Sequence, residues 1–373
     1  MALGRQKPGM TDVQTKLIEL LAPLAGQGVV SASVIPRAGA RPLTYWAPQS
    51  DDEPGFLVYS ITKVFIASVV LKLCEEGAMR LEDPLARWFP RIDRAEQITV
   101  RRLLNHTAGI PDYGGSAAYH ASVRAVPSMP WSFERFGAET FDKGLWFEPG
   151  DGWAYSNPGY MLVKRIVEQV AGASLRNLVA DQIARPLGLL RTFVPESVED
   201  LATLAPGVSR ALAPDGEPRD VRQSYHPGWV SHGVVASTSS ELVRFLDGLF
   251  QGQFLSHTSL ARMLELVALP GAEPDRYRGQ PSYGLGLMGD PGSRWGLVVG
   301  HNGGGPCYSA SAFHAVELGG ASICVMTAVE ESVQAAEEVV FAMQEHLGHD
   351  RHNRAAQQAL HQTAAEGTES GRW

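Results

Sequence analysis

The feature that most constrains the fold is residues 60–76, a segment that is apolar on nearly every face of a helix. Its apolar members leave no continuous polar stripe; they are Ile61, Val64, Phe65, Ile66, Val69, Val70, Leu71 and Leu73. A helix that is apolar all round belongs in the interior of a protein. Gly77 predicts its end, because glycine commonly terminates helices. The rest of the chain is therefore expected to pack around this segment.

The composition is consistent with such a core. The chain has 373 residues, of which 44% are hydrophobic and 19% charged, an ordinary balance for a globular protein of one large domain or two intertwined ones. The net charge of −8 argues against nucleic-acid binding, because such proteins usually carry a basic face. Three cysteines, Cys74, Cys307 and Cys324, are too few for a disulfide framework.

The amino-terminal residues 1–9 lack the apolar stretch and cleavage site of a signal peptide. The sequence also holds no apolar run of the length that a membrane-spanning helix needs. We therefore expect a cytoplasmic protein with no membrane partner, although a chain already trimmed of its leader would look similar.

Patterns typical of strands lie early and late in the sequence, with helical patterns between them. Short apolar runs between turn residues predict strands over 29–35, 297–299, 309–313 and 321–328. Helical periodicity predicts one helix that ends at Gly172 and a second that begins after a Thr238–Glu241 capping box. Further helices are predicted around Leu260, Met263, Leu264 and Val267, and over about 330–347.

This order predicts an α/β (α+β) fold with one sheet built from both ends of the chain. The sheet region would comprise residues 1–59 and 275–348, and residues 60–274 would form an inserted, mostly helical region. Residues 349–373 are polar and are expected to form a tail.

The first candidate for chemistry is Ser60-Ile-Thr-Lys63, at the start of the buried segment. Residues three apart on a helix are neighbours, so Lys63 can reach the Ser60 hydroxyl. Burial disfavours the charged ammonium, so Lys63 could accept the serine proton, and N–H groups at the helix start could stabilise an oxyanion. The alternative is a capping serine followed by a lysine that extends to solvent. Only six of the 32 basic residues are lysines, which makes this position informative.

Two further motifs carry polar groups in turns. In Tyr155-Ser-Asn157, side chains two residues apart can project into one cavity, where a tyrosine could act as base or proton donor. In His301-Asn-Gly-Gly304, glycines after a strand permit close approach of a ligand, and the Gly304 N–H could be a second oxyanion donor. The alternatives are a packed aromatic beside a turn asparagine, and a hairpin turn with an exposed histidine.

These three motifs, in this order, resemble the serine β-lactamase and penicillin-binding-protein superfamily. The likeness is to its class C-like branch of esterases, D-amino-acid amidases and DD-peptidases, which use Ser-x-x-Lys, Tyr-x-Asn and Lys/His-x-Gly. It extends over about residues 15–345, with further matching segments at 103–113, 148–150, 186–189, 233–238 and 283–286. The resemblance implies a β-lactamase/transpeptidase-like fold, an antiparallel sheet flanked by helices with an inserted helical region.

The resemblance also implies the roles of the motif residues. Ser60 would be the acylated nucleophile, with Lys63 and Tyr155 sharing the work of general base. Tyr155 would protonate the leaving group and Asn157 would position the lysine and the substrate amide. The N–H groups of Ser60 and Gly304 would form the oxyanion hole.

His301 stands where β-lactamases carry a lysine. Histidine is mostly uncharged near neutral pH, whereas penicillins and peptides ending in D-alanine present a carboxylate. Neutral esters and amides are therefore favoured as substrates, unless an arginine approaches the site; the candidates are Arg276, Arg278 and Arg294.

Further residues are candidate substrate contacts. Asn302 and Gly303 follow the histidine, and Cys307 could narrow the acyl pocket, although a small buried thiol is the simpler interpretation. Loops rich in aromatic residues border the substrate cleft in the relatives, whereas in this chain the same residues could instead pack in the core. The candidates for such a pocket wall are Trp146, Tyr225 and Trp229.

These observations predict a serine hydrolase that forms an acyl-enzyme with a small ester or amide, including D-amino-acid derivatives. An acyltransferase that passes the acyl group to an amine or alcohol instead of water is the alternative. A β-lactamase or DD-carboxypeptidase and an inactive binding module are less favoured. No His-Glu-x-x-His zinc motif occurs, so we expect no metal or other cofactor, and the oligomeric state stays open.

Overall fold

The computed structural model describes residues 11–212 and 215–349. The amino-terminal residues 1–9, on which the leader question rests, lie outside this part of the chain. Residues 350–373, which make up nearly all of the expected polar tail, lie outside it as well.

The centre of the molecule is an eight-stranded sheet in which every neighbouring pair is antiparallel. Its order is β2-β1-β12-β11-β10-β9-β8-β7, so the first strands pair with the last. Strands from the start and the end of the chain thus lie in one sheet, which also includes β7 from within the region 60–274. The strands are β1 Val30–Ile35, β2 Leu43–Ala47, β7 Val267–Ala268, β8 Ser282–Tyr283, β9 Met288–Asp290, β10 Val298–Gly304, β11 Ser309–Ala315 and β12 Ala321–Thr327.

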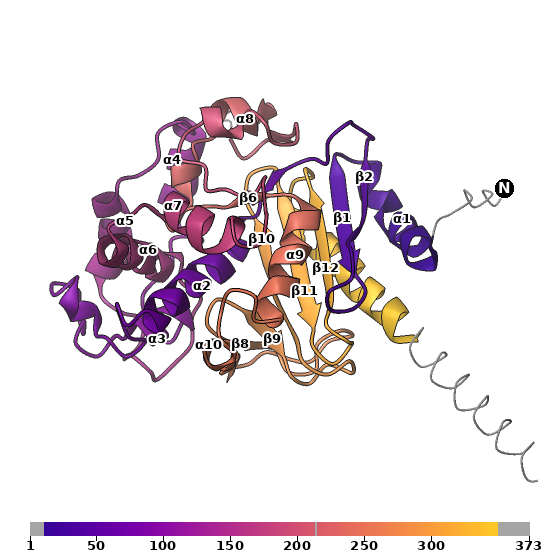
Figure 1. The fold of residues 1–373 in the computed structure, drawn as a ribbon. Coiled ribbons are helices and arrows are strands. Elements are labelled where there is room, and N and C mark those ends of the chain that lie inside the picture. The colour runs from indigo at the N-terminus through magenta and orange to yellow at the C-terminus, as the bar shows by residue number, and fades with distance from the viewer. Residues whose placement is uncertain (1–10, 213–214, 350–373) are drawn as a thin grey trace, which may run out of the picture.

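Helices cover both faces of this sheet (Figure 1). Helix α9, Ser239–Phe250, packs on one face against β1, β11 and β12. Helix α1, Asp12–Ala25, and the helix over 333–349 share an apolar core with the strands. The sheet is therefore buried between two helical layers, as the apolar sequences of its central strands require.

The remaining helices form a second region beside the sheet (Figure 1). They are α2 Thr62–Glu75, α3 Val100–Leu104, α4 Ala117–Ala125, α5 Phe133–Glu139, α6 Asn157–Ala171, α7 Leu175–Val179, α8 Val221–Ser224 and α10 His257–Met263. Two-stranded pairs join β3 Phe56–Leu57 to β6 Ala236–Ser237 and β4 Val208–Ser209 to β5 Arg219–Asp220. Single turns lie at Tyr59–Ile61, Leu85–Arg87, Phe141–Lys143, Ala180–Ala184, Glu199–Leu201 and Pro227–Trp229.

Helix α2 is the buried helix that its composition predicts. Residues 62–71 are all buried, and they pack against α6, α7 and α10. Full burial of an aliphatic or phenylalanine side chain contributes about 1.5–3 kcal/mol relative to an exposed position. The helix is followed by Gly77, whose φ of +72° is a conformation that glycine adopts without a steric penalty.

Two details of the predicted helices are corrected. Thr238 caps α9 by accepting a hydrogen bond from the Glu241 N–H, but the reciprocal half of the capping box is not formed. The Glu241 carboxylate instead accepts hydrogen bonds from the Arg191 N–H and the Thr192 hydroxyl. Helix α10 ends at Met263, and Val267 begins strand β7.

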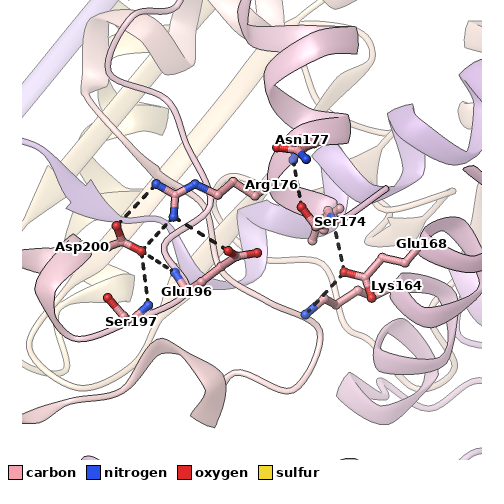
Figure 2. Close-up of polar contacts among 9 residues, drawn as sticks. Lys164, Glu168, Ser174, Arg176, Asn177, Glu196, Ser197 and Asp200 are labelled. Carbon is pink, nitrogen blue, oxygen red and sulfur yellow. Dashed lines mark hydrogen bonds and ion pairs between the residues drawn. The ribbon is translucent and has the colours of Figure 1, made fainter. Parts of the chain in front are cut away.

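Polar contacts fix the short helix α7 to the end of α6 and to the segment around Asp200 (Figure 2). Ser174 caps its first turn, and Arg176 pairs with Asp200 at 2.9 Å. Glu168 at the end of α6 accepts a hydrogen bond from the first N–H of α7 at 3.1 Å. A partly exposed ion pair contributes only about 0–1 kcal/mol to the free energy of unfolding. The Arg176–Asp200 pair therefore serves mainly to hold the segment around Asp200 against α7.

Candidate active site

Ser60 lies in the single turn that leads into α2 and reaches a cavity of about 510 Å³. Tyr59, directly before it, has a φ of +42°, an unfavourable conformation for a residue with a side chain. Strained backbone of this kind persists only where the surrounding structure holds it. Here β10 packs directly against the turn. The nucleophile candidate is therefore presented from a rigid, well-supported segment.

Lys63 is completely buried one helical turn further on. Its Nζ lies 3.3 Å from Ser60 Oγ, 2.8 Å from Asn157 Oδ1 and 3.3 Å from His232 Nε2. Two predicted motifs, Ser-x-x-Lys and Tyr-x-Asn, thus meet at this amine, as expected.

The surroundings of Lys63 change its protonation. Burial lowers the pKa of its amine to about 7, because the low-dielectric interior disfavours the ammonium, while the charge of Asp112 acts in the opposite direction. A lysine that is partly neutral at physiological pH can accept a proton.

Tyr155 faces the same amine. Its ring centroid is 4.7 Å from Lys63 Nζ. Burial raises the pKa of its phenol well above the ordinary value, and a hydrogen bond with Ser60 acts in the opposite direction. The phenol therefore stays protonated at neutral pH. This distinguishes it from Lys63 and makes it better suited to donate a proton than to accept one.

Asp112 is a site residue that the sequence reasoning missed. It accepts hydrogen bonds from the Asn157 backbone N–H at 2.8 Å and from Asn157 Nδ2 at 3.4 Å. These bonds fix the amide of Asn157 so that its Oδ1 faces Lys63. The signal was present in the segment 103–113, but spacing alone does not connect residue 112 to residue 157.

Strand β10 closes the site from the other side. A Cβ atom on Gly303 would lie 2.0 Å from the Val58 carbonyl oxygen, so only glycine permits this approach to the nucleophile turn. Gly304 lines the same cavity as Ser60. An oxyanion hole made by their two N–H groups remains a prediction that this placement supports.

His301 lies behind the cavity rather than in its lining. Its Nε2 is 3.0 Å from the Tyr283 hydroxyl and its Nδ1 is 2.5 Å from the Asn302 carbonyl oxygen. Burial, followed by the charge of Lys63, lowers the pKa of the imidazole to about 3. The third motif therefore supplies a neutral side chain, without a cation for a substrate carboxylate.

Five candidate substrate contacts are absent from the cavity lining, Gly303 among them. Trp229 is buried and donates its indole N–H to the Pro127 carbonyl, and Trp146 is 58% exposed on a loop. The Asn302 side chain points to the opposite face of the sheet from His301, because successive residues of a strand alternate, and its amide donates a hydrogen bond to the Glu337 carboxylate. Cys307 is buried, which raises the pKa of its thiol to about 12 and makes a thiolate unfavourable.

The candidate arginines also lie elsewhere. Arg278 pairs with Glu337, while Arg276 and Arg294 pair with Glu345. Arg124, which the sequence reasoning did not single out, lines the cavity.

Aromatic rings form much of the cavity wall. Tyr113, Tyr119 and Tyr225 line it, of which only Tyr225 was a sequence candidate. The Tyr113 hydroxyl donates to Ser231 and the Tyr119 hydroxyl to the Trp229 carbonyl, at 3.0 and 3.1 Å. Because these hydroxyls already have partners, the tyrosines offer the cavity mainly apolar ring surface.

The fold is β-lactamase-like, and solved structures share it. A D-stereospecific amidohydrolase from Streptomyces sp. superposes with a TM-score of 0.74 at 29% identity, over 88% of this chain and 97% of that one. The D-amino acid amidase from Ochrobactrum anthropi SV3, complexed with L-phenylalanine amide, gives a TM-score of 0.76 at 25% identity, over 91% and 100%. The sequence matches the family described as Beta-lactamase over residues 17–342, and the chain belongs to that family.

Curated relatives include enzymes that act on esters and proteins of the penicillin-binding class. Penicillin-binding protein 4* from Bacillus subtilis (strain 168) is 28% identical over 314 residues, 77% of this chain and 65% of the relative. Esterase EstB from Burkholderia gladioli is 26% identical over 297 residues, 66% of this chain and 73% of the relative. The chain spans 59% to 65% of the length of the first three such relatives.

Two further observations on the described residues concern metal binding and membrane insertion. Within residues 11–212 and 215–349, no three histidine, cysteine, aspartate or glutamate side chains are grouped as a metal site. None of the helices in this part of the chain has the length and apolar character needed to span a bilayer.

Proposed function

We propose that this protein is a serine hydrolase that forms an acyl-enzyme at Ser60 with a small, uncharged ester or amide. The observation that carries the proposal is the fully buried Lys63, whose Nζ lies 3.3 Å from Ser60 Oγ and whose pKa is about 7. A serine hydroxyl is a weak nucleophile until a neighbouring base accepts its proton, and this amine is placed and tuned to do so.

The reaction then follows from the positions of the side chains. Neutral Lys63 accepts the Ser60 proton while Oγ forms a bond to the substrate carbonyl carbon, and the carbonyl oxygen becomes an oxyanion. The N–H groups of Ser60 and Gly304 bind that oxyanion. Tyr155 gives its proton to the leaving alcohol or amine as the bond to it breaks, and the proton held by Lys63 restores the phenol.

The acyl-enzyme is resolved by the same groups. Lys63 accepts a proton from water, the hydroxyl attacks the acyl carbon, and Ser60 leaves with a proton returned through Lys63 and Tyr155. The acid forms and the free enzyme returns. An amine or alcohol in place of water would give acyl transfer with no change in the protein groups used.

The site favours an uncharged substrate with an apolar acyl group. The cavity of about 510 Å³ falls within the range typical of small-molecule sites. Its tyrosine walls suit an aromatic or bulky group, and the neutral His301 offers no ionic partner to a carboxylate. The arginine in the cavity lining, Arg124, is accompanied there by two acidic residues, Glu330 and Glu331, which disfavour a carboxylate. Two of the similar solved structures are described as a D-stereospecific amidohydrolase and a D-amino acid amidase, which makes D-amino-acid amides the first amide class to test.

The test is a matched substrate panel with wild type and Ser60→Ala. We expect turnover of p-nitrophenyl esters and of D-phenylalanine amide to exceed turnover of nitrocefin, and Ser60→Ala to lose all of it. Adding hydroxylamine or an amino acid ester separates hydrolysis from acyl transfer by the products formed. Preferred turnover of nitrocefin or of a peptide ending in D-alanine would instead support a β-lactamase or DD-carboxypeptidase.

A further inference from the structure

His232 is a buried histidine that no sequence motif singled out. It is 1% exposed, lies between the turn Pro227–Trp229 and strand β6, and contributes to the lining of the Ser60 cavity. Its Nε2 is 3.3 Å from Lys63 Nζ, although the two residues are 169 positions apart.

The backbone on both sides of His232 is fixed. The Ser231 N–H donates to the Tyr113 hydroxyl at 3.2 Å. The Val235 N–H donates to Thr62 Oγ1 at 2.8 Å, and the Val58 N–H donates to the Val235 carbonyl at 2.9 Å. His232 is therefore held against the first turn of α2 by hydrogen bonds to the segment that carries Ser60 and Lys63.

The polar partners of Lys63 match the hydrogens of its amine. A lysine ammonium has three N–H donors, and three side-chain atoms lie within hydrogen-bond distance of Nζ: Ser60 Oγ, Asn157 Oδ1 and His232 Nε2. A neutral amine has two N–H groups and one lone pair. If Asn157 and His232 accept the two N–H groups, the lone pair faces Ser60, which is the direction that proton abstraction needs.

We propose that His232 is a positioning residue for Lys63 that turns the lone pair of the neutral amine toward the Ser60 hydroxyl. The inference rests on the proposed function, because it assigns His232 a part in the acylation of Ser60. His232 would neither touch the reacting carbonyl nor exchange a proton with it.

This role needs a neutral imidazole whose Nε2 is an acceptor. Burial, followed by the charge of Lys63, lowers the pKa of His232 well below its ordinary value, so the ring is neutral. Nδ1 then carries the hydrogen; it is buried and has no hydrogen-bond partner among the described residues. The titratable groups that interact with His232 or Lys63 are Asp112, His106, Tyr155, Tyr160, Lys164 and His301.

The opposite tautomer makes the inference falsifiable. An N–H on Nε2 would donate to the lone pair of Lys63 and hold it away from Ser60, so removal of His232 would then accelerate acylation or leave it unchanged.

The experiment compares two amides of different reach. In His232→Gln the terminal amide extends to about the position of Nε2, whereas in His232→Asn it ends near Nδ1 and cannot reach Lys63. For both variants, for His232→Ala and for wild type, the rate at which a fluorophosphonate probe phosphonylates Ser60 with loss of fluoride is measured from pH 5 to 9, as a surrogate for acylation. Thermal unfolding of each variant is recorded in parallel.

The informative quantity is the rate on the plateau above the acidic limb, where Lys63 is neutral in every variant. We expect His232→Asn and His232→Ala to lower the plateau about tenfold, the effect of losing one orienting hydrogen bond, and His232→Gln to recover most of it. A variant that changed only the pKa of Lys63 would shift the limb and keep the plateau.

Equal plateaus for the Gln and Asn variants, or a plateau above that of wild type, would overturn the inference. If His232→Ala does not fold, the Gln and Asn pair still decides. Failure of wild type to label at Ser60 would instead reject the proposed function, so the two outcomes are distinguishable.

Discussion

The replacement of Gly303 by alanine is the sharpest structural test of how the site is built. A Cβ at this position would lie 2.0 Å from the Val58 carbonyl oxygen, whereas real Cβ atoms essentially never come closer than 3.0 Å. The contact is with backbone, so no side chain can rotate away. Either β10 or the turn that carries Ser60 must move by about 1 Å, which separates Gly304 from Ser60.

A displacement of this size has a defined expected effect. A misplacement of about 1 Å at a reacting centre can reduce the rate about 100-fold, which corresponds to roughly 2.7 kcal/mol of transition-state stabilisation. Overpacking of this kind also lowers the free energy of unfolding, typically by about 1–3 kcal/mol.

The assay measures the second-order rate at which a fluorophosphonate probe phosphonylates Ser60, as a surrogate for acylation, and the thermal unfolding of the same preparation. Gly115→Ala is the control, because a Cβ there would meet no atom within 4 Å. A folded Gly303→Ala variant that acylates at the wild-type rate would refute the reasoning that β10 and the nucleophile turn together form the oxyanion site.

Three further predictions follow from the groups around Lys63. Protonated Lys63 cannot accept the Ser60 proton, so the acylation rate in a stopped-flow pH profile should rise with pH through about 7 and then level off. A rate independent of pH from 5 to 9 would exclude Lys63 as the base. Tyr155→Phe should slow hydrolysis of D-phenylalanine amide by at least tenfold more than hydrolysis of a p-nitrophenyl ester, because p-nitrophenolate leaves without a proton; equal losses on both substrates would contradict the donor role. Asp112→Asn should lower the acylation rate about tenfold on the plateau above pH 7, where loss of the Asp112 charge no longer changes the protonation of Lys63, because an amide has only one oxygen to accept hydrogen bonds from Asn157. Circular dichroism should show an unchanged fold, and an unchanged plateau rate would show that Asn157 is oriented without Asp112.

Much of the fold could be predicted because several of its elements have a clear pattern in their own local sequence. Helix α2 is apolar on all sides, and strand β12 is a mostly apolar run that follows a pair of glycines. Only the first two residues of β10 are apolar, and the strand continues through the His301–Gly304 motif. Strands β7 and β8 have two residues each, too few to show an alternating pattern. Val267 shows the consequence, since its position fits the helical period of the preceding residues but the chain has already turned into β7.

The candidate site divides in the same way. Ser60 and Lys63 lie one helical turn apart, so their contact follows from local geometry. Asp112 and His232 reach the cluster only through the tertiary fold, and no spacing rule connects them to it. Trp229 was a candidate for the pocket wall because it is aromatic, but it lies in the core, where its indole N–H donates a hydrogen bond to the Pro127 carbonyl oxygen. A buried tryptophan usually needs such a partner for its N–H group.

An acyl group carried by Ser60 is the central requirement of the proposed mechanism. Intact-protein mass spectrometry after rapid mixing with a p-nitrophenyl ester, with wild type and Ser60→Ala side by side, tests this claim. We predict a transient mass increase equal to the acyl group on wild type only, which decays as free acid forms. Faster decay in the presence of an amine acceptor would indicate acyl transfer in place of hydrolysis. An adduct of the same mass on Ser60→Ala, or p-nitrophenol release by wild type with no adduct at any time, would contradict an acyl-enzyme at Ser60.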